Sequence, residues 1–180
     1  MSIYTKTGDG GNTGLANGQR VSKDSKVIEF VGLLDELNSL LGVCVSELYE
    51  VSNFDFKPEI DVIEEIQKDL FVVGSISVGA KIKFDSAAEV ENIEKTIDDY
   101  EKLLPKLKNF ILPGGSTSAA QIHLARTYAR KVERFAVSLK SLSIQPFLPY
   151  LNRLSDLLFV MARYINFKEK IQETIWEPQS

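Results

Sequence analysis

Three arginines and one glutamate stand along one side of a helical stretch in the second half of the chain. Arg126, Arg130 and Glu133 follow one another at intervals of four and three residues, with Arg134 beside them. Residues at such intervals share one face of a helix. The fork of N–H donors on an arginine matches the oxygens of a phosphate. The stretch therefore fits either one wall of an anion-binding site or a solvated helix face with local Arg–Glu pairs.

A second candidate site lies in the first 26 residues, where glycines alternate with hydroxyl side chains and a lysine. Residues 5–11 read TKTGDGG, and Thr13 follows. The backbone N–H groups of such turns can line a concave anion nest, and Lys6 adds a positive charge. The segment lacks the Lys-Ser/Thr pair that ends a Walker A loop, and it does not match the dinucleotide fingerprint. The alternative is a flexible terminal arm without a ligand.

Other kinds of chemistry find little support in the residue types. His123 is the only histidine and Cys44 the only cysteine, so neither a zinc site nor a Ser-His-Asp arrangement is indicated. The Glu-x-x-His pairs of a di-iron bundle are missing from the sequence. We expect His123 to lie on the surface or to support a neighbouring residue. Because Cys44 falls on an apolar stripe, we expect it to be a buried structural thiol.

The composition is that of one ordinary globular domain. The chain has 180 residues, of which 44% are hydrophobic and 26% charged, and its net charge is −4. The negative charge argues against nonspecific binding to nucleic acid or to an anionic membrane. Apolar runs stay well short of the ~20 residues of a membrane span, and the start of the chain lacks the apolar core of a secretory signal. We therefore expect a cytoplasmic protein.

Apolar residues at helical spacing predict an all-α fold. Short connections favour antiparallel neighbours, so we expect a five-helix up-and-down bundle over residues 27–167, preceded by an irregular Gly-rich arm, residues 1–26. The tail, residues 168–180, is weakly patterned and is expected to be frayed. An apolar triplet that begins at Phe110 fits either a loop pinned to the core or a lid over a ligand. The five helices are predicted over residues 26–49, 58–80, 86–104, 116–139 and 146–167.

Six segments of the chain, taken in order, resemble the PduO-type ATP:cob(I)alamin adenosyltransferases, also called corrinoid adenosyltransferases. Each segment is weakly specific alone, whereas six in the same order on a five-helix pattern are strongly indicative. Together they span most of the chain. The segments are TKTGDGG at residues 5–11, GQRVSK at 18–23, DELN at 35–38, FILPGG at 110–115, ARTYARKVER at 125–134 and YLNRLSD at 150–156.

The resemblance implies an enzyme that transfers the 5′-deoxyadenosyl group of ATP to the cobalt of cob(I)alamin, giving adenosylcobalamin and triphosphate. It also implies Mg²⁺ bound through ATP, with unassigned protein ligands, and a homotrimer with active sites between subunits. A cobalamin reductase and an adenosylcobalamin-dependent enzyme are the implied partners. The alternative is a noncatalytic nucleotide or corrinoid binder, such as a protein that delivers adenosylcobalamin.

The resemblance assigns residue roles by motif match. Asp35 is expected to pair with Arg126 across the subunit boundary, and Phe110 to press on the lower face of the corrinoid and keep its lower nitrogen ligand off cobalt. These three residues form the expected corrinoid site, and with Arg130 they form the expected catalytic set. Lys131 stands where the family often has a second arginine, so its role is open. The expected ATP site comprises Thr5, Lys6, Thr7, Gly8, Asp9, Gly10, Gly11, Thr13, Lys23, Arg130, Glu133, Arg134 and Asn152.

Overall fold

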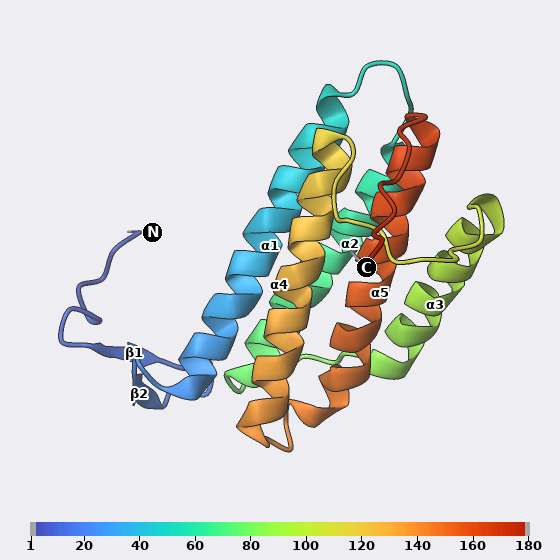
Figure 1. Cartoon of the computed structure of the whole chain (residues 1–180). Coiled ribbons are helices and arrows are strands. Elements are labelled where there is room, and N and C mark those ends of the chain that lie inside the picture. Colours follow the sequence, from blue (N-terminus) through green and yellow to red (C-terminus); the bar gives the residue numbers. More distant parts are fainter. Residues whose placement is uncertain (1–2, 179–180) are drawn as a thin grey trace.

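Long helices form a bundle with a small hairpin at its N-terminal side in the computed structural model, which describes residues 3–178 (Figure 1). The helices are α1 (Lys26–Glu50), α2 (Lys57–Ser77), α3 (Ser86–Leu103), α4 (Thr117–Leu139) and α5 (Leu148–Lys168), the last preceded by the short 3₁₀ helix η1 (Gln145–Phe147). This confirms the predicted all-α bundle. α2 packs on α1, α1 on α4, α4 on α5 and α5 on α3. Since α5 lies between α4 and α3, these three helices can share a groove.

α5 carries the centre of the hydrophobic core. Its apolar residues at helical spacing are buried, with each member of this stripe at most 1% exposed: Tyr150, Leu154, Leu157, Met161 and Ile165. Burying a side chain of this size contributes on the order of 2 kcal/mol. The stripe therefore fixes α5 firmly against its neighbours and also fixes the direction of the polar side chains on its other faces.

One polar residue of α1 is buried. Asn38 is 6% exposed. Its side-chain amide donates to the carbonyl of Gln67 on α2 at 2.9 Å, and Gln67 Nε2 donates to the carbonyl of Asn38 at 3.0 Å. These two hydrogen bonds compensate for the burial of the amide groups, so α1 and α2 are joined by a polar contact inside their interface.

The helix ends follow local turn chemistry. The Asp85 carboxylate accepts a hydrogen bond from Ala88 N at the start of α3, and Ser116 Oγ accepts one from Ala119 N at the start of α4; both are N-caps. α2 ends before the predicted residue 80, because Gly79 adopts a left-handed φ of 92° and stops the helix. None of the described helices is long and apolar enough to cross a membrane.

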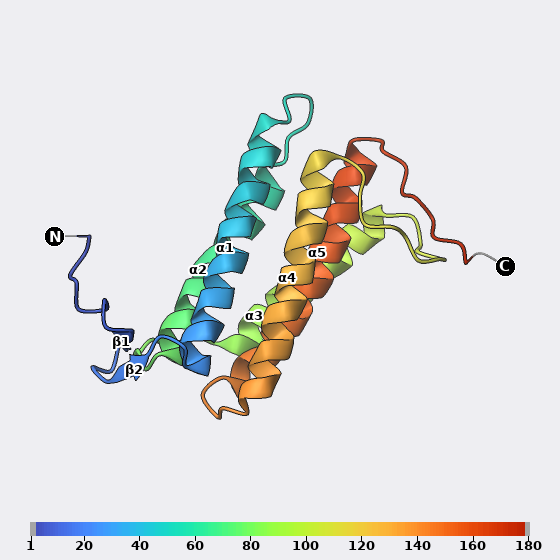
Figure 2. The same ribbon diagram turned by 60° about the vertical axis from the view of Figure 1, so that its left-hand side comes forward.

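The N-terminal arm has hydrogen-bonded structure of its own. Strands β1 (Asn12–Gly14) and β2 (Arg20–Ser22) form an antiparallel hairpin. Arg20 Nη2 donates to the carbonyls of Thr7 at 2.7 Å and of Asn12 at 3.1 Å. These contacts favour a preformed arm over a flexible one. Figures 1 and 2 both show the arm projecting from the start of α1, away from α4 and α5.

The C-terminal tail is docked over its described residues 169–178, so the prediction of a frayed tail was wrong there; residues 179 and 180 lie outside the described part. The tail turns back along the loop between α3 and α4. Leu112 N donates to the carbonyl of Thr174, and Trp176 N donates to that of Phe110, both at 2.8 Å. Helical periodicity could not predict this contact, because the tail is extended and its partner is a loop distant in sequence.

Candidate functional site

Two of the α4 arginines face a groove between α3, α4 and α5. Arg126 and Arg130 line it together with Ser155 and Phe159 of α5. Arg126 is half-buried and Arg130 is exposed. Because the arginines line a concave surface rather than a flat one, the structure favours the anion-binding wall over the solvated helix face.

Arg126 is a cation without a partner among the described residues. Its Nε is buried and donates no hydrogen bond to any described residue, and its guanidinium carbon lies 5.9 Å from the ring centre of Phe159. Burial, followed by the positive charge of Arg130, lowers the pKa of Arg126. A half-buried charge is costly unless an anion compensates it, so this site is suited to receive a carboxylate or a phosphate.

Asp35 does not reach Arg126 within one chain. It is exposed on α1 and lines a separate groove between α1 and α4, together with Leu40, Val43 and Tyr128. Val43 is 44% exposed, so this groove presents apolar surface beside the carboxylate. The pairing of Asp35 with Arg126 remains a prediction that concerns two subunits.

Two residues of the expected ATP site meet between α4 and α5. Asn152 Nδ2 donates to Glu133 Oε1 at 2.8 Å, and Arg153 Nη1 donates to Asn152 Oδ1 at 2.7 Å. Arg153 is held in turn by Glu94 of α3 at 2.7 Å. This chain of contacts fixes Glu133 and Asn152 relative to each other. Arg134 follows Glu133 on α4 and is exposed.

Lys131 points toward α1 rather than into the groove of Arg126 and Arg130. Its Nζ lies 3.3 Å from Glu36 Oε2 and 5.2 Å from the ring centre of Tyr128. Both partners line the α1–α4 groove that contains Asp35. The structure thus separates Lys131 from the arginines beside it in sequence.

The glycine-rich arm gathers most of the other residues expected to bind ATP. Consecutive turns link Asp9 N to the carbonyl of Lys6 and Gly11 N to that of Gly8, and Lys23 N donates to the carbonyl of Gly11 at 2.9 Å. A Cβ at Gly8 would lie 3.1 Å from Lys23 Nζ, which shows how closely this lysine covers the turn. The arm cluster formed in this way comprises Thr5, Lys6, Thr7, Gly8, Asp9, Gly10, Gly11, Thr13 and Lys23.

The arm cluster and the α4 groove are held apart in a single chain. The hydrogen bonds of Thr5, Thr7 and Arg20 stay within the arm, and the arm extends away from α4 in both views (Figures 1 and 2). Each cluster offers positive groups to an anion, but neither surrounds one. The structure therefore leaves the arm cluster and the α4 groove as two separate parts of the expected ATP site.

Phe110 presents a large apolar ring to solvent. It is 79% exposed, and it lies in the loop that leads to α4. At the end of this loop Gly115 adopts a φ of 111°, and a Cβ there would lie 2.0 Å from Asn166 Oδ1 of α5. Only glycine fits this approach. The loop is pinned to α5, whereas the ring of Phe110 stays exposed. A role of this loop as a lid over a ligand remains a prediction.

Trp176 is a candidate site residue that sequence reasoning missed. Its ring lies 6.3 Å from the ring of Phe110 at an angle of 75°, and both side chains line a shallow pocket with Pro178. No periodicity marks this residue. The available signal was its type, since it is the single tryptophan of the chain and aromatic side chains are enriched in binding surfaces.

His123 is buried, so the expectation of a surface residue was wrong. It is 2% exposed, neither ring nitrogen has a hydrogen-bond partner among the described residues, and burial, then the charge of Arg126, lowers its pKa to about 4. The imidazole is therefore neutral at pH 7. Cys44 is buried as predicted, and burial raises the pKa of its thiol to about 12, which makes it a poor nucleophile.

The described residues contain no group of three or more histidine, cysteine, aspartate or glutamate side chains arranged to hold a metal ion. The chemistry of Mg²⁺ does not require such a cage. Mg²⁺ is held in proteins by one or two carboxylates together with substrate phosphates. Glu133, fixed by Asn152, is the carboxylate that the α4 wall offers for this purpose.

Comparison with known proteins gives a consistent result. The family model described as cobalamin adenosyltransferase matches residues 3–165. The chain is 42% identical to the corrinoid adenosyltransferase of Bacillus subtilis, over 98% of this chain and 93% of that protein. The PduO-type ATP:corrinoid adenosyltransferase from Lactobacillus reuteri, as a phenylalanine-to-alanine variant complexed with cobalamin and ATP, matches with a TM-score of 0.90 and 34% identity, over 98% of this chain and 100% of that one. An arginine-to-lysine variant from the same organism, complexed with ATP, gives a TM-score of 0.88 and 34% identity, over 97% and 100% of the two chains.

Proposed function

The chain belongs to the cobalamin adenosyltransferase family, and we propose that it transfers the 5′-deoxyadenosyl group of ATP to the cobalt of cob(I)alamin, with triphosphate as the leaving group. The observation that carries the proposal is the α4 groove, where Arg126 has no ionic partner among the described residues and the exposed Arg130 stands one turn away. A polyanionic substrate is the kind of ligand that such a groove favours.

The reaction depends on position and electrostatics more than on proton transfer. The corrinoid cobalt supplies an electron pair. Its bond to the 5′ carbon forms while the bond from that carbon to the triphosphate oxygen breaks, and the negative charge passes to the triphosphate. No side chain has to act as a general base. This agrees with a His123 that is buried and neutral.

Positive groups of the arm cluster and of α4 would stabilise the charge that develops on the triphosphate. Lys6, Lys23 and the N–H groups of the glycine turns belong to the arm, and Arg130 belongs to α4. Glu133, Arg134 and Asn152 would complete the nucleotide site. Because the hydrogen bond between Asn152 and Glu133 already exists without a ligand, this part of the site is preorganised.

Mg²⁺ would enter the site with ATP and neutralise part of the triphosphate charge. Phosphate oxygens would provide most of its ligands, and Glu133 would provide one carboxylate. Arg130 and Arg134 on either side of Glu133 would then contact the phosphate oxygens that the ion leaves free.

Phe110 would form the apolar floor beneath the corrinoid. Its ring is exposed on a loop anchored to α5, so a planar ligand can stack on it. Such contact would displace both water and the lower nitrogen ligand from cobalt. Loss of that ligand makes Co(II) easier to reduce to the nucleophilic Co(I) state.

A homotrimer with the site between subunits would bring together what one chain holds apart. Asp35 and Arg126 line different grooves of the same chain, and the arm cluster projects away from α4 (Figure 2). In a cyclic assembly each copy can present one groove to its neighbour. Asp35 of one subunit would then compensate the Arg126 charge of the next, and the arm would cover the nucleotide.

The chemistry also implies partners. A reductase must supply electrons to Co(II), and an adenosylcobalamin-dependent enzyme must consume the product. We place the protein in the cytoplasm with both partners.

The proposal is tested by mixing the protein anaerobically with ATP, Mg²⁺ and cob(I)alamin and following the corrinoid spectrum. We expect adenosylcobalamin to form with one triphosphate released for each molecule of product. Arg130→Ala should slow the reaction roughly 100-fold, the size expected when one electrostatic contact to a transition state is lost. Lys140→Ala, which removes an exposed cation just after α4, is the control and should react normally.

The second candidate function is a noncatalytic protein that binds the nucleotide or delivers adenosylcobalamin. It is favoured by the exposed apolar surface of Phe110 and Trp176, which can hold a corrinoid without chemistry. Tight binding of adenosylcobalamin with no triphosphate release from ATP would support this candidate and reject the transferase.

A further inference from the structure

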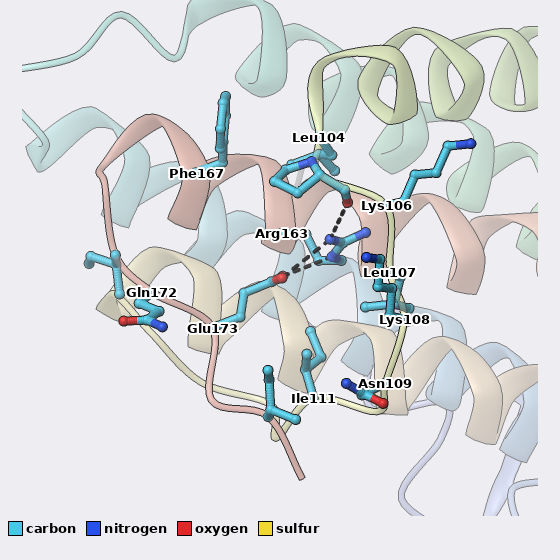
Figure 3. Close-up of a pocket in the computed structure, with 13 residues that line it drawn as sticks. Leu104, Lys106, Leu107, Lys108, Asn109, Ile111, Arg163, Phe167, Gln172 and Glu173 are labelled. Carbon is cyan, nitrogen blue, oxygen red and sulfur yellow. Dashed lines mark hydrogen bonds and ion pairs between the residues drawn. The ribbon is translucent and has the colours of Figure 1, made fainter.

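One arginine of α5 ties three separate segments together behind the Phe110 loop. Arg163 is 5% exposed. Its Nε and Nη2 donate to the two carboxylate oxygens of Glu173 in the tail, at 2.8 and 3.2 Å, and Nη2 also donates to the carbonyl of Pro105 at 3.0 Å. Figure 3 shows these bonds inside a pocket between the tail, α5 and the start of the loop. We call this set of contacts the clasp.

A second anchor holds the other end of the loop. Asn166 follows Arg163 by three residues and so lies on the same side of α5. Its Oδ1 accepts a hydrogen bond from Ser116 N at 3.0 Å, and its Nδ2 donates to the carbonyl of Gly114 at 2.9 Å. The loop that carries Phe110 is thus attached to α5 at both ends.

Between these anchors, the tail rather than the bundle holds Phe110. Its carbonyl accepts a hydrogen bond from Trp176 N at 2.8 Å, and its ring contacts the Trp176 ring edge-on. Because the Phe110 side chain is 79% exposed, packing against the core does not set its position. Among the described residues, the pair of Arg163 and Glu173 is the one ion pair that links residues 169–178 to the bundle.

We propose that Arg163 is a positioning residue of the adenosyl-transfer site: through Glu173 it docks the C-terminal tail, and the docked tail holds Phe110 at the corrinoid. This inference rests on the proposed function, because it takes Phe110 to contact the lower face of the corrinoid. A bidentate arginine–carboxylate pair suits the role because its geometry fixes orientation as well as distance.

Fluorescence of the single tryptophan reports tail docking without any ligand. Glu173→Lys places a second positive charge beside Arg163 and should release the tail. Glu177→Lys makes the same change of charge later in the tail at an exposed position and is the matched control. We expect quenching of Trp176 by acrylamide to rise about twofold in Glu173→Lys and to stay unchanged in the control. Glu173→Gln keeps the size of the side chain, should give an intermediate rise, and serves if Glu173→Lys does not fold.

The effect on the reaction should run through Phe110. We expect Glu173→Lys to lower turnover roughly tenfold while the KM for ATP changes less than about twofold. Bound cob(II)alamin should also regain the spectrum of the form that keeps its lower ligand. In the Phe110→Ala background, Glu173→Lys should cause no further loss of turnover. If Glu173 acts on the reaction only through Phe110, the effects of the two substitutions do not add.

Each of these measurements can overturn the proposal. Unchanged Trp176 quenching in Glu173→Lys and Glu173→Gln would show that the clasp does not dock the tail. A released tail with normal turnover and an unchanged corrinoid spectrum would remove the positioning role, as would losses that add to those of Phe110→Ala. If the wild-type protein forms no adenosylcobalamin, the proposed function fails, and the quenching comparison still decides whether the clasp docks the tail.

Discussion

Arg126 and Phe110 are residues whose surroundings are incomplete within one chain. Arg126 is a half-buried cation with no described partner, and Phe110 is an aromatic ring left in solvent. The type and spacing of Arg126 fitted an anion site, and the family resemblance implied that Phe110 contacts the corrinoid. The structure places each of them at a concave surface. Arg163 and Trp176 were not predicted, because their roles depend on an extended tail that no periodic pattern reveals.

Loss of either charge of the proposed intersubunit pair should abolish most activity. Replacing Arg126 or Asp35 by alanine leaves the other charge uncompensated in a partly buried place, and such losses cost roughly 100-fold or more. Steady-state formation of adenosylcobalamin measures the effect. Glu29→Ala, which removes an exposed carboxylate from the same helix as Asp35, should retain normal activity. Near-normal turnover in both Arg126→Ala and Asp35→Ala would remove the pair from the site.

Truncation of the exposed phenylalanine should separate nucleotide binding from corrinoid chemistry. We expect Phe110→Ala to bind ATP with its dissociation constant changed less than about twofold, since Phe110 lies in the loop and not in the arm cluster. Reduction of bound Co(II) should fail, because the lower ligand stays on cobalt. Calorimetry for ATP and anaerobic reduction followed by absorbance measure the two effects. Leu142→Ala, an equally exposed apolar loop residue, is the control; unchanged reduction in Phe110→Ala would contradict its role.

At the scale of elements, a partly buried polar contact between α2 and α5 makes the stability of the bundle sensitive to pH. Tyr150 Oη donates to Asp69 Oδ2 at 3.0 Å. Burial raises the pKa of the Asp69 carboxyl from 3.8 to about 6, although the bond from Tyr150 acts in the opposite direction. The folded protein thus holds a proton at Asp69 more tightly than the unfolded chain does. This group favours folding most at low pH and loses that contribution as pH rises through about 6.

Asp69→Asn should therefore flatten the pH dependence of stability. The amide can still accept the hydrogen bond from Tyr150 but does not titrate. Between pH 7 and pH 5 the free energy of unfolding of the wild type should gain on the order of 1 kcal/mol relative to Asp69→Asn, a value reduced for the partial exposure of the carboxyl. Urea unfolding at both pH values measures this. Glu64→Gln on the same helix is the control, and equal slopes for wild type and Asp69→Asn would reject the assignment.

Helices with one buried face were predictable from the spacing of their apolar residues. Contacts that depend on a second helix were not predictable, because the spacing within one helix does not report its partner. The stripe of α5 from Tyr150 to Ile165 could be predicted because each residue recurs at helical spacing and buries apolar area. The burial of Asn38 could not be predicted from α1 alone, because it depends on Gln67 of another helix. His123 was misplaced because its position on α4 faces Phe159 of α5, which sequence spacing within α4 does not reveal.

At the scale of the whole molecule, the chain carries the parts of a site without joining them. The arm cluster extends from the start of α1 (Figure 1), while the arginine groove lies between α3, α4 and α5. The sequence motifs identified these parts and their order along the chain. Their separation in space could not be predicted from motif order, because the order of motifs along a chain does not report how far apart they lie in the folded structure. In the proposed homotrimer, different copies would supply the two parts.

Mixing two inactive variants tests this central claim most directly. Asp35→Ala and Arg126→Ala, combined 1:1 in co-expressed trimers, should recover about a quarter of the wild-type turnover, since about one interface in four then unites an intact Asp35 with an intact Arg126. Each variant alone should remain inactive, and sedimentation should show trimers throughout. Mixed trimers without any recovered adenosylcobalamin formation would contradict a site built between subunits.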